Sequence, residues 1–187
     1  MKGYILPLAL ILSLSFVMAA SYDLERYPIP FVVNGIFNAK IIVGQNAATS
    51  DVIGAIDIAA SLIAESQTDI QIGRISSLFD SHIGMLDVDA PELGAENLIV
   101  VGGPCANAVA AELLGYPMPC NDGFEFGKAM IRYFPEQKAL LVAGYEAQET
   151  LAASYIIADY KDYDLSGDEM EVTIAGQDIL ALNPVVI

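Results

Sequence analysis

Residues 97–128 read NLIVVGGPCANAVAAELLGYPMPCNDGFEFGK, and this stretch decides the fold. Its beginning, Leu98–Val101, is a run of aliphatic residues without alternation, which is typical of a strand covered on both faces. Gly102 and Gly103 then free the backbone to turn, and an alanine-rich segment typical of a helix follows and ends at Gly115. The pattern therefore predicts a strand, a glycine turn and a helix in succession.

The same order occurs twice more in the chain. Residues 39–43 lead through Gly44 into one helical pattern, and residues 139–142 lead through Gly144 into another at about residues 146–158. Parallel strands that are linked by helices cross over right-handed and place helices on both faces of the sheet. We therefore expect an α/β fold, a three-layer sandwich with a mainly parallel sheet built from repeated strand–Gly turn–helix units.

The helix after Gly44 carries one narrow polar stripe on an otherwise apolar surface. Thr49, Ser50 or Asp51 can cap its start. Because apolar residues occupy the rest of its circumference, most of this helix is predicted to be buried. Asp57 lies in the stripe, and we expect it to be solvated or paired rather than catalytic.

The remaining segments give weaker signals. Residues 31–37 contain an Asn-Gly turn between apolar flanks, and residues 121–133 are predicted to form a helix. Between residues 67 and 96 the pattern weakens, so we expect short strands or irregular structure there. Two apolar runs flank residues 175–178 and predict a C-terminal β-hairpin at about residues 169–183.

The N-terminus has the layout of a secretory signal peptide. Lys2 precedes an apolar run at residues 4–17, and small residues follow it. A transmembrane anchor is the alternative, but the run is short for a bilayer span and Pro7 interrupts it. We therefore expect residues 1–20 to be cleaved, with no membrane span after cleavage and residues 21–187 forming a single domain.

The composition indicates a globular domain with an acidic surface. The 187 residues include 8 Lys plus Arg against 24 Asp plus Glu, which gives a net charge of -16, while 55% of the residues are hydrophobic. Nucleic acid is not an expected partner because phosphate binding needs a basic surface. An acidic surface can attract divalent cations or basic partners, although solubility alone explains it equally well.

Cys105 and Cys120 are the only two cysteines of the chain. In an exported chain we expect one disulfide between them, which would stabilise the fold by about 3 kcal/mol on the chain-entropy estimate. The alternative is a reactive thiol, because Cys105 lies at the start of a predicted helix, where the dipole favours thiolate. His82 is the only histidine that could serve such a thiol as a base.

The glycine turns are the candidate ligand-facing positions. Doubly wound folds bind phosphates and other ligands at such turns, which here contain Gly44, Gly102, Gly103 and Gly144. None of the three turns has the spacing of a dinucleotide fingerprint or a P-loop, and none contains a basic residue. Tight strand-to-helix geometry is the alternative explanation of these glycines.

Residues 162–167 read DYDLSG and match the first six positions of a calcium loop. Thr173 stands where such a loop needs its bidentate Glu, so a polar turn is the alternative. Calcium is therefore the one cofactor that the sequence suggests. The candidate metal ligands are Asp162, Asp164, Ser166 and Asp168.

Six segments carry a resemblance to a known family. They read YPIPFVVNGIFNAKIIVG at residues 27–44, DVIGAIDIAASL at residues 51–62, NLIVVGGPCANAVAAELLG at residues 97–115, PCNDGFEFGKAMIRYF at residues 119–134, ALLVAGYEAQETLAASYIIADY at residues 139–160 and LSGDEMEVT at residues 165–173. Together they resemble the archaeal surface-layer (S-layer) protein family. More distantly, the strand–glycine–helix units are similar to bacterial cell-wall-binding repeats.

The resemblance implies an exported, non-enzymatic structural component at the extracellular cell surface. Such a protein associates with itself or with other envelope proteins, its cysteine pair is a disulfide, and its glycine turns are architectural. The alternative is a secreted α/β module that binds a small molecule or a glycan at the C-terminal ends of the strands. An enzyme that uses Cys105 with His82 is the least favoured hypothesis, because no catalytic motif occurs in the chain.

Overall fold

The computed structural model describes residues 23–66, 83–176 and 178–185. Within them, one seven-stranded sheet has the strand order β4-β3-β5-β7-β6-β8-β9. The first four strands in this order are parallel, and β6, β8 and β9 continue the sheet in antiparallel pairing. The strands are β3 (Lys40–Val43), β4 (Gly84–Leu86), β5 (Leu98–Val101), β6 (Lys128–Phe134), β7 (Ala139–Gly144), β8 (Glu169–Ala175) and β9 (Asp178–Pro184).

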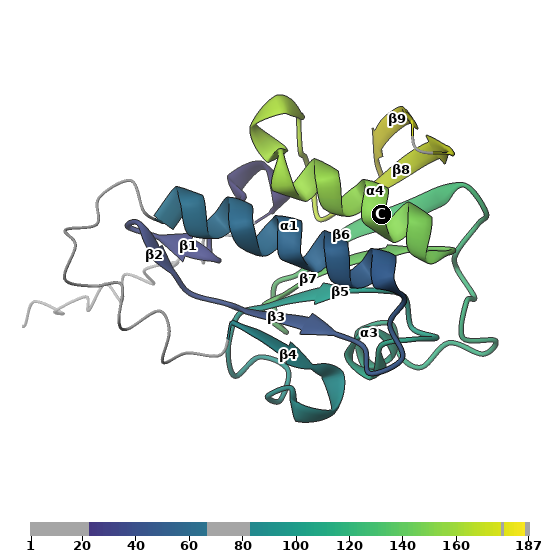
Figure 1. Ribbon diagram of the computed structural model, residues 1–187, viewed down its shortest axis with the longest axis horizontal. Helices are drawn as coiled ribbons and strands as arrows, with labels where there is room; N and C mark the ends of the chain where they lie inside the picture. Colours follow the sequence, from purple (N-terminus) through teal and green to yellow (C-terminus); the bar gives the residue numbers. More distant parts are fainter. Residues whose placement is uncertain (1–22, 67–82, 177, 186–187) are drawn as a thin grey trace, which may run out of the picture.

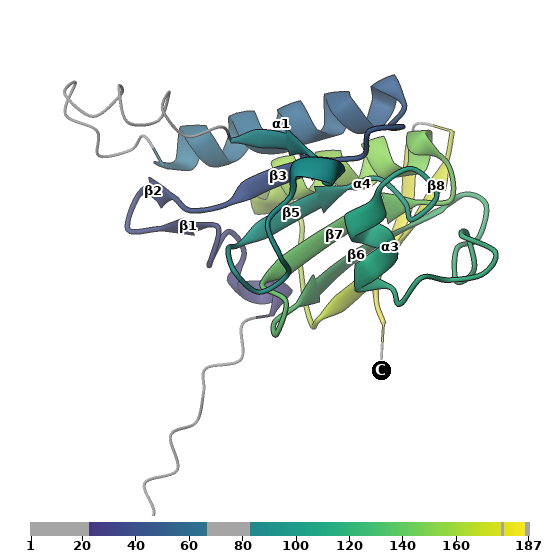
Figure 2. The ribbon, with the colours of Figure 1, turned by 90° about the horizontal axis from the view of Figure 1, so that it is seen from below.

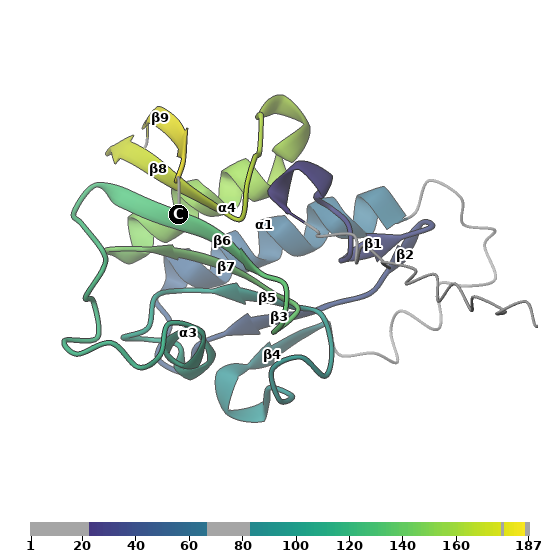
Figure 3. The same cartoon turned by 180° about the vertical axis from the view of Figure 1, so that it is seen from behind.

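Helices cover both faces of the sheet (Figure 1). α1 (Thr49–Ser66) and α4 (Ala147–Ala158) lie side by side on one face, and the short α3 (Ala108–Leu113) lies on the other, as Figure 2 shows from below. β8 and β9 form a hairpin at the edge of the sheet (Figure 3). The predicted three-layer α/β sandwich with a C-terminal hairpin is thus confirmed. The same residues include the 3-10 helices η1 (Leu24–Arg26), η3 (Asp87–Asp89) and η4 (Tyr160–Asp162).

The two central parallel strands are buried on both faces, as their unbroken aliphatic runs predict. In β5, Ile99 and Val101 pack in the core under α1 and α4, whereas Leu98 and Val100 pack in the core that includes α3. All residues of β5 and β7 are buried. Each buried Val, Leu or Ile side chain of these strands stabilises the fold by about 1.5–3 kcal/mol when it leaves water, so both helical layers are held to the sheet by apolar contact.

The prediction of a helix at residues 121–133 is wrong. Lys128–Phe134 form β6, which pairs antiparallel with β7. Ala129, Ile131 and Tyr133 are buried, and the side chains between them are only partly covered. This period of two is the pattern of a strand. Met130 and Phe134 add apolar residues to the less buried face and thereby obscure the alternation in the sequence.

The N-terminal segment docks on the core before the sheet begins. β1 (Val32–Val33) and β2 (Ile36–Phe37) form a short hairpin whose turn lies at Asn34 and Gly35, both with positive φ. Positive φ at both turn positions is the geometry that Asn-Gly favours, so the turn prediction is confirmed. The side chains of Leu24 and Phe31 are buried in the core and fix this segment to the sandwich.

Some predictions fall on other parts of the chain. The signal peptide predicted at residues 1–20 and the histidine at position 82 lie outside the described residues. Among the residues that the structure does describe, no helix combines the length and the apolar composition that crossing a bilayer requires.

Candidate functional site

The C-terminal ends of β3, β5 and β7 bring the candidate glycine turns together. A Cβ atom at Gly103 would lie 3.3 Å from the carbonyl oxygen of Gly144, and one at Gly102 would lie 3.7 Å from the carboxyl group of Asp51 on α1. This edge also holds a topological switch point, because β4 lies on one side of β3 and β5 lies on the other. Open α/β sheets bind their ligands at such a point.

Two of the four glycines are explained by packing alone. A Cβ atom at Gly44 would lie 1.9 Å from the carbonyl oxygen of Ala106. A Cβ atom at Gly144 would lie 2.4 Å from the Cβ atom of Glu149. Since neither distance is compatible with a side chain, the tight-turn interpretation accounts for Gly44 and Gly144 without a ligand.

The N-terminus of α4 is capped by its own acidic residues. Glu146 and Glu149 form a capping box, in which Glu149 Oε2 accepts the amide hydrogen of Glu146 at 3.0 Å. Glu149 Oε1 accepts a second hydrogen bond, from the amide of Gly127 at 3.2 Å. Two negative side chains therefore occupy the positive end of this helix dipole, where a phosphate would otherwise bind.

The N-terminus of α3 is capped in a similar way. Asn107 Oδ1 accepts from the amides of Val109 and Ala110, at 3.0 and 3.2 Å. Asp87 reaches across from η3, where Oδ2 accepts from the amide of Ala108 and Oδ1 from the amide of Gln45, both at 2.8 Å. The amides that bind phosphate in doubly wound folds thus already have partners within the chain, so the geometry does not favour an anion here.

A small cleft lies between these turns and is called the switch cleft below. Its volume is about 150 Å³, which is less than the 300–1,000 Å³ usual for drug-sized ligands. Among the described residues that line it there is no Lys, Arg or His, and its acidic members are Asp51 and Glu146. Its apolar wall includes Pro104, Phe124 and Tyr145.

Asp51 is the least satisfied polar group of the switch cleft. Its side chain is only 3% exposed. Oδ2 accepts from the amide of Ala48 at 3.1 Å, whereas Oδ1 is buried and makes no hydrogen bond with any described residue. Burial raises the pKa of the Asp51 carboxyl, and hydrogen bonds from the amide of Ala48 and the hydroxyl of Thr150 lower it only in part. The sequence indicated Asp51 as one of three candidate helix caps, but did not indicate that one of its oxygens would lack a partner.

Cys105 and Cys120 form a disulfide, as predicted, with their Cα atoms 5.1 Å apart. α3 begins only at Ala108, so Cys105 lies in the turn before the helix and not in its first turn. The bond joins this turn to the loop that follows α3. Because the sulfur is oxidised, the free thiol that the enzyme hypothesis required is absent.

The segment of the predicted calcium loop makes hydrogen bonds with other parts of the chain. Ser166 donates its amide hydrogen to the sulfur of Met170 at 3.3 Å, and Gly167 accepts from the amide of Leu24 at 2.9 Å. In the described part of the chain, no three acidic, histidine or cysteine side chains come together as a metal site. The structure therefore does not support calcium at Asp162, Asp164, Ser166 and Asp168.

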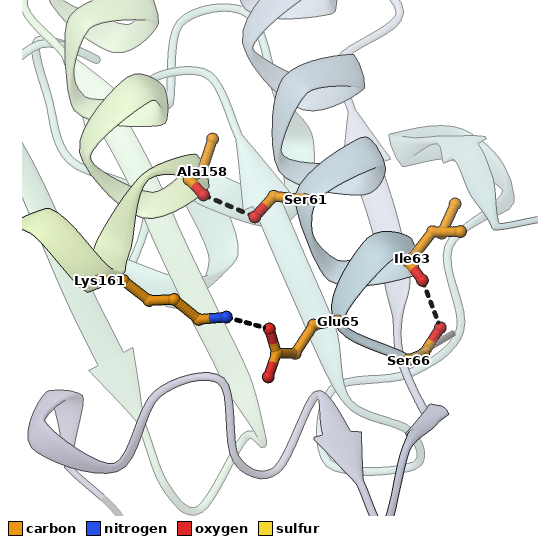
Figure 4. Close-up of polar contacts among 6 residues, drawn as sticks. All are labelled: Ser61, Ile63, Glu65, Ser66, Ala158 and Lys161. Carbon is orange, nitrogen blue, oxygen red and sulfur yellow. Dashed lines mark hydrogen bonds and ion pairs between the residues drawn. The ribbon is translucent and has the colours of Figure 1, made fainter. Parts of the chain in front are cut away.

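The polar stripe of α1 faces α4 instead of solvent, while Ala55, Ile58 and Leu62 bury another side of the helix in the core. Ser61 Oγ donates to the carbonyl oxygen of Ala158 at 2.5 Å, and Glu65 pairs with Lys161, whose pKa this carboxylate raises (Figure 4). Ser66 caps its own helix by donating to the carbonyl oxygen of Ile63 at 2.8 Å (Figure 4). Asp57 is only partly buried, as expected for a solvated carboxylate.

The opposite side of α1 is apolar and exposed. Val52, Ile53 and Ile56 are 40%, 42% and 59% exposed, and Ala60 continues the same stripe. We call these four residues the α1 apolar face. The prediction that most of α1 is buried is therefore wrong. The stripe of Gly54, Ser61 and Glu65 makes the contact with α4, and the α1 apolar face lies outside both this contact and the contact of the helix with the core.

A second exposed apolar surface lies on the loop that the disulfide closes and on the segment after it. Tyr116, Met118 and Phe126 are 65%, 87% and 75% exposed. The ring of Phe126 contacts the ring of Tyr145 edge-on, with the centroids 6.1 Å apart. We call these residues the loop apolar surface.

Comparison with known protein families gives a match in the first part of the chain. The model of the S-layer like family, outer domain, matches residues 23–74. No curated protein matches the chain. The matched stretch contains the N-terminal hairpin, β3 and α1, and thus the first strand–turn–helix unit together with the α1 apolar face. The resemblance to S-layer proteins is therefore confirmed, and residues 23–74 are the part of this chain that carries the match to the S-layer like family.

Proposed function

We propose that this protein is an exported, non-enzymatic structural component of an archaeal cell envelope. It acts by associating with itself or with other envelope proteins. The family match points to a structural role at the cell surface. Export, the archaeal source and the means of association go beyond the family match and are proposed here.

The observation that carries the proposal is the α1 apolar face. On a helix of 18 residues, polar groups are used to contact α4, while Val52, Ile53 and Ile56 remain exposed. Exposed apolar surface of this kind is unfavourable in water and marks sites of protein association. An apolar stripe that stays exposed while the other sides of the helix pack against α4 and the core favours an interface over a ligand pocket.

The loop apolar surface supplies a second contact on a different element. Two different surfaces on one subunit allow head-to-tail contacts, which propagate into open arrays where they do not close into rings. The α1 apolar face and the loop apolar surface are therefore suited to build an extended layer.

The test compares assembly of the mature chain with that of two single variants. Ile56→Glu places a charge in the centre of the α1 apolar face. Leu180→Glu, at a residue of β9 that is 64% exposed, is the matched control. Light scattering and electron microscopy over a concentration series should show assembly by the wild type and the control, and monomers for Ile56→Glu. A wild type that stays monomeric and does not fractionate with envelopes would refute the proposal.

A further inference from the structure

We infer that the α1 apolar face of one copy receives the loop apolar surface of a second copy. The inference rests on the proposed function, since it names the partner of the face that carries that function. Both surfaces are exposed within a single copy, so the chain does not cover one with the other. α3, which leads into the loop, lies on the face of the sheet opposite α1 (Figure 2). The contact therefore joins two copies.

The exposed side of α1 carries no charged residue. Its exposed positions are Thr49, Val52, Ile53, Ile56, Ala60 and Ala64. The acids of the helix lie elsewhere, because Asp51 is buried, Asp57 is partly buried and Glu65 pairs with a lysine of η4. The outer face of a surface helix is normally polar or charged, so this side of α1 has the composition of a buried one. A partner with an acidic border can therefore approach it without meeting like charge.

The loop apolar surface has such a border. Residues 103–127 include Glu112, Asp122 and Glu125 but no Lys, Arg or His. All three acids are exposed, and among the described residues only Glu125 forms an ion pair, with Lys128 at 2.9 Å. Two loop surfaces that face each other would bring these acids together, and like charges across an interface are unfavourable. Charge therefore favours the uncharged face of α1 over a second loop as the partner of the loop.

The sizes of the side chains favour the same pairing. Met118 and Phe126 are the most exposed large apolar residues of the described chain, at 87% and 75%, and methionine and aromatic residues are enriched at interfaces. Ala60 and Ala64 follow Ile56 by one and two turns on the same side of α1, so their short side chains leave space there for a long one. Pairing α1 with α1 would bury only aliphatic side chains and leave Met118 and Phe126 in water.

The area of the contact indicates how strong it is. At 65% and 75% exposure, Tyr116 and Phe126 offer about 200–350 Å² of surface between them. With Met118 and the α1 apolar face added, the total stays at or below about 1,200 Å², the lower limit of stable specific interfaces. One contact is therefore weak, and an assembly gains stability when each copy makes it twice, once through each surface.

The experiment mixes two variants that each lack one half of the contact. Ile56→Glu damages the α1 apolar face and keeps the loop apolar surface, whereas Met118→Glu does the reverse. At concentrations at which the wild type assembles, each variant alone should sediment as a monomer, and their equimolar mixture should form a heterodimer with twice the mass of one copy. The heterodimer itself shows that both variants are folded. The double variant with both substitutions is the control and should form no complex with either single variant.

Two outcomes overturn this pairing without touching the proposed function. One is a Met118→Glu variant that pairs with itself, which indicates contact between two α1 faces. The other is a mixture that stays monomeric although the wild type assembles. A wild type that never assembles refutes the pairing and the proposed function together.

A charge swap at Ile56 tests the acidic border directly. The ammonium group of Ile56→Lys would meet the acids of the loop, whereas the carboxylate of Ile56→Glu would meet like charge. Ile56→Lys should therefore self-associate about fivefold more tightly than Ile56→Glu. Added salt should narrow the difference, because it screens both interactions. Two α1 faces in contact would instead bring like charges together in both variants, so equal affinities would also overturn the inference.

Discussion

The first turns of α1 and α4 hold acidic side chains that are buried to a similar extent but bonded differently. Glu149 in α4 is 6% exposed, and each of its carboxylate oxygens accepts an amide hydrogen. Asp51 in α1 is 3% exposed, and only one of its oxygens does so. Both follow a strand and a glycine turn. Two buried acids in equivalent turns therefore differ in how fully the surrounding chain bonds them.

The largest effect should come from breaking the turn that leads into α1. Gly44→Ala would place a Cβ atom 1.9 Å from the carbonyl oxygen of Ala106, so the backbone itself must shift. Because overpacking against backbone cannot be relieved by a rotamer change, we expect a loss of about 3 kcal/mol or more in the free energy of unfolding. Chemical denaturation measures it.

The control for this variant is Gly123→Ala. Gly123 has φ +87°, and a Cβ atom added there would meet no heavy atom within 4 Å beyond its chain neighbours, so only backbone strain should result. We expect a loss of about 1–2 kcal/mol. Equal losses at the two positions would mean that close approach is not what requires Gly44.

The next effect separates the two acids directly. Glu149→Ala leaves the partly buried amides of Gly127 and Glu146 without their acceptor, and an unsatisfied donor costs up to about 1–3 kcal/mol where water cannot reach it. We expect a loss of about 2–4 kcal/mol in the free energy of unfolding. Glu149→Gln keeps one acceptor oxygen and should lose about half as much. If Glu149→Ala is as stable as the wild type, the capping box does not hold this turn.

Asp51→Asn should act in the opposite direction. The amide retains an oxygen for the hydrogen bond from Ala48 and removes the charge that burial disfavours. The free energy of unfolding at neutral pH should therefore stay the same or rise. A loss greater than about 1 kcal/mol would show that the Asp51 carboxylate is bonded as fully as that of Glu149.

The smallest effect is the part of the pH dependence of stability that the raised pKa of Asp51 contributes. Since burial raises its pKa in the folded state, the folded protein binds this proton more readily than the unfolded chain does. The resulting stability is present at low pH and is lost as the pH rises through the folded pKa. Tyr145, Glu146 and Glu149 face the same region. The free energy of unfolding of the wild type and of Asp51→Asn is measured from about pH 4 to about pH 7. The wild-type value should fall relative to that of the variant as the pH rises. A difference that stays constant or grows would contradict the predicted direction.

The parallel half of the fold could be predicted from the sequence because each part has an unambiguous local signal. β5 and β7 are unbroken aliphatic runs, and α4 begins and ends within a residue of the predicted bounds. β6 could not be predicted in this way, because Met130 and Phe134 are apolar on its less buried face and conceal the alternation. Its pairing with β7 is a contact that becomes evident only in three dimensions.

The candidate sites were less accessible to prediction. The order of strand, glycine turn and helix is visible in the sequence, but the close contacts of the glycines depend on distant segments, such as Ala106 against Gly44. The orientation of α1 was predicted wrongly because a polar stripe normally faces solvent, whereas here small and polar side chains match those of α4. The unbonded oxygen of Asp51 has no signal in the sequence, since bonding is a property of the assembled turn.

The disulfide also affects how readily the molecule can form contacts. Tyr116 and Met118 are exposed on a loop whose two ends are joined covalently through Cys105 and Cys120. Surfaces that are ordered in advance lose less conformational entropy when a partner binds. In an oxidising environment the loop therefore presents a nearly rigid contact, and chemical reduction should weaken association through it even where the α/β core remains folded.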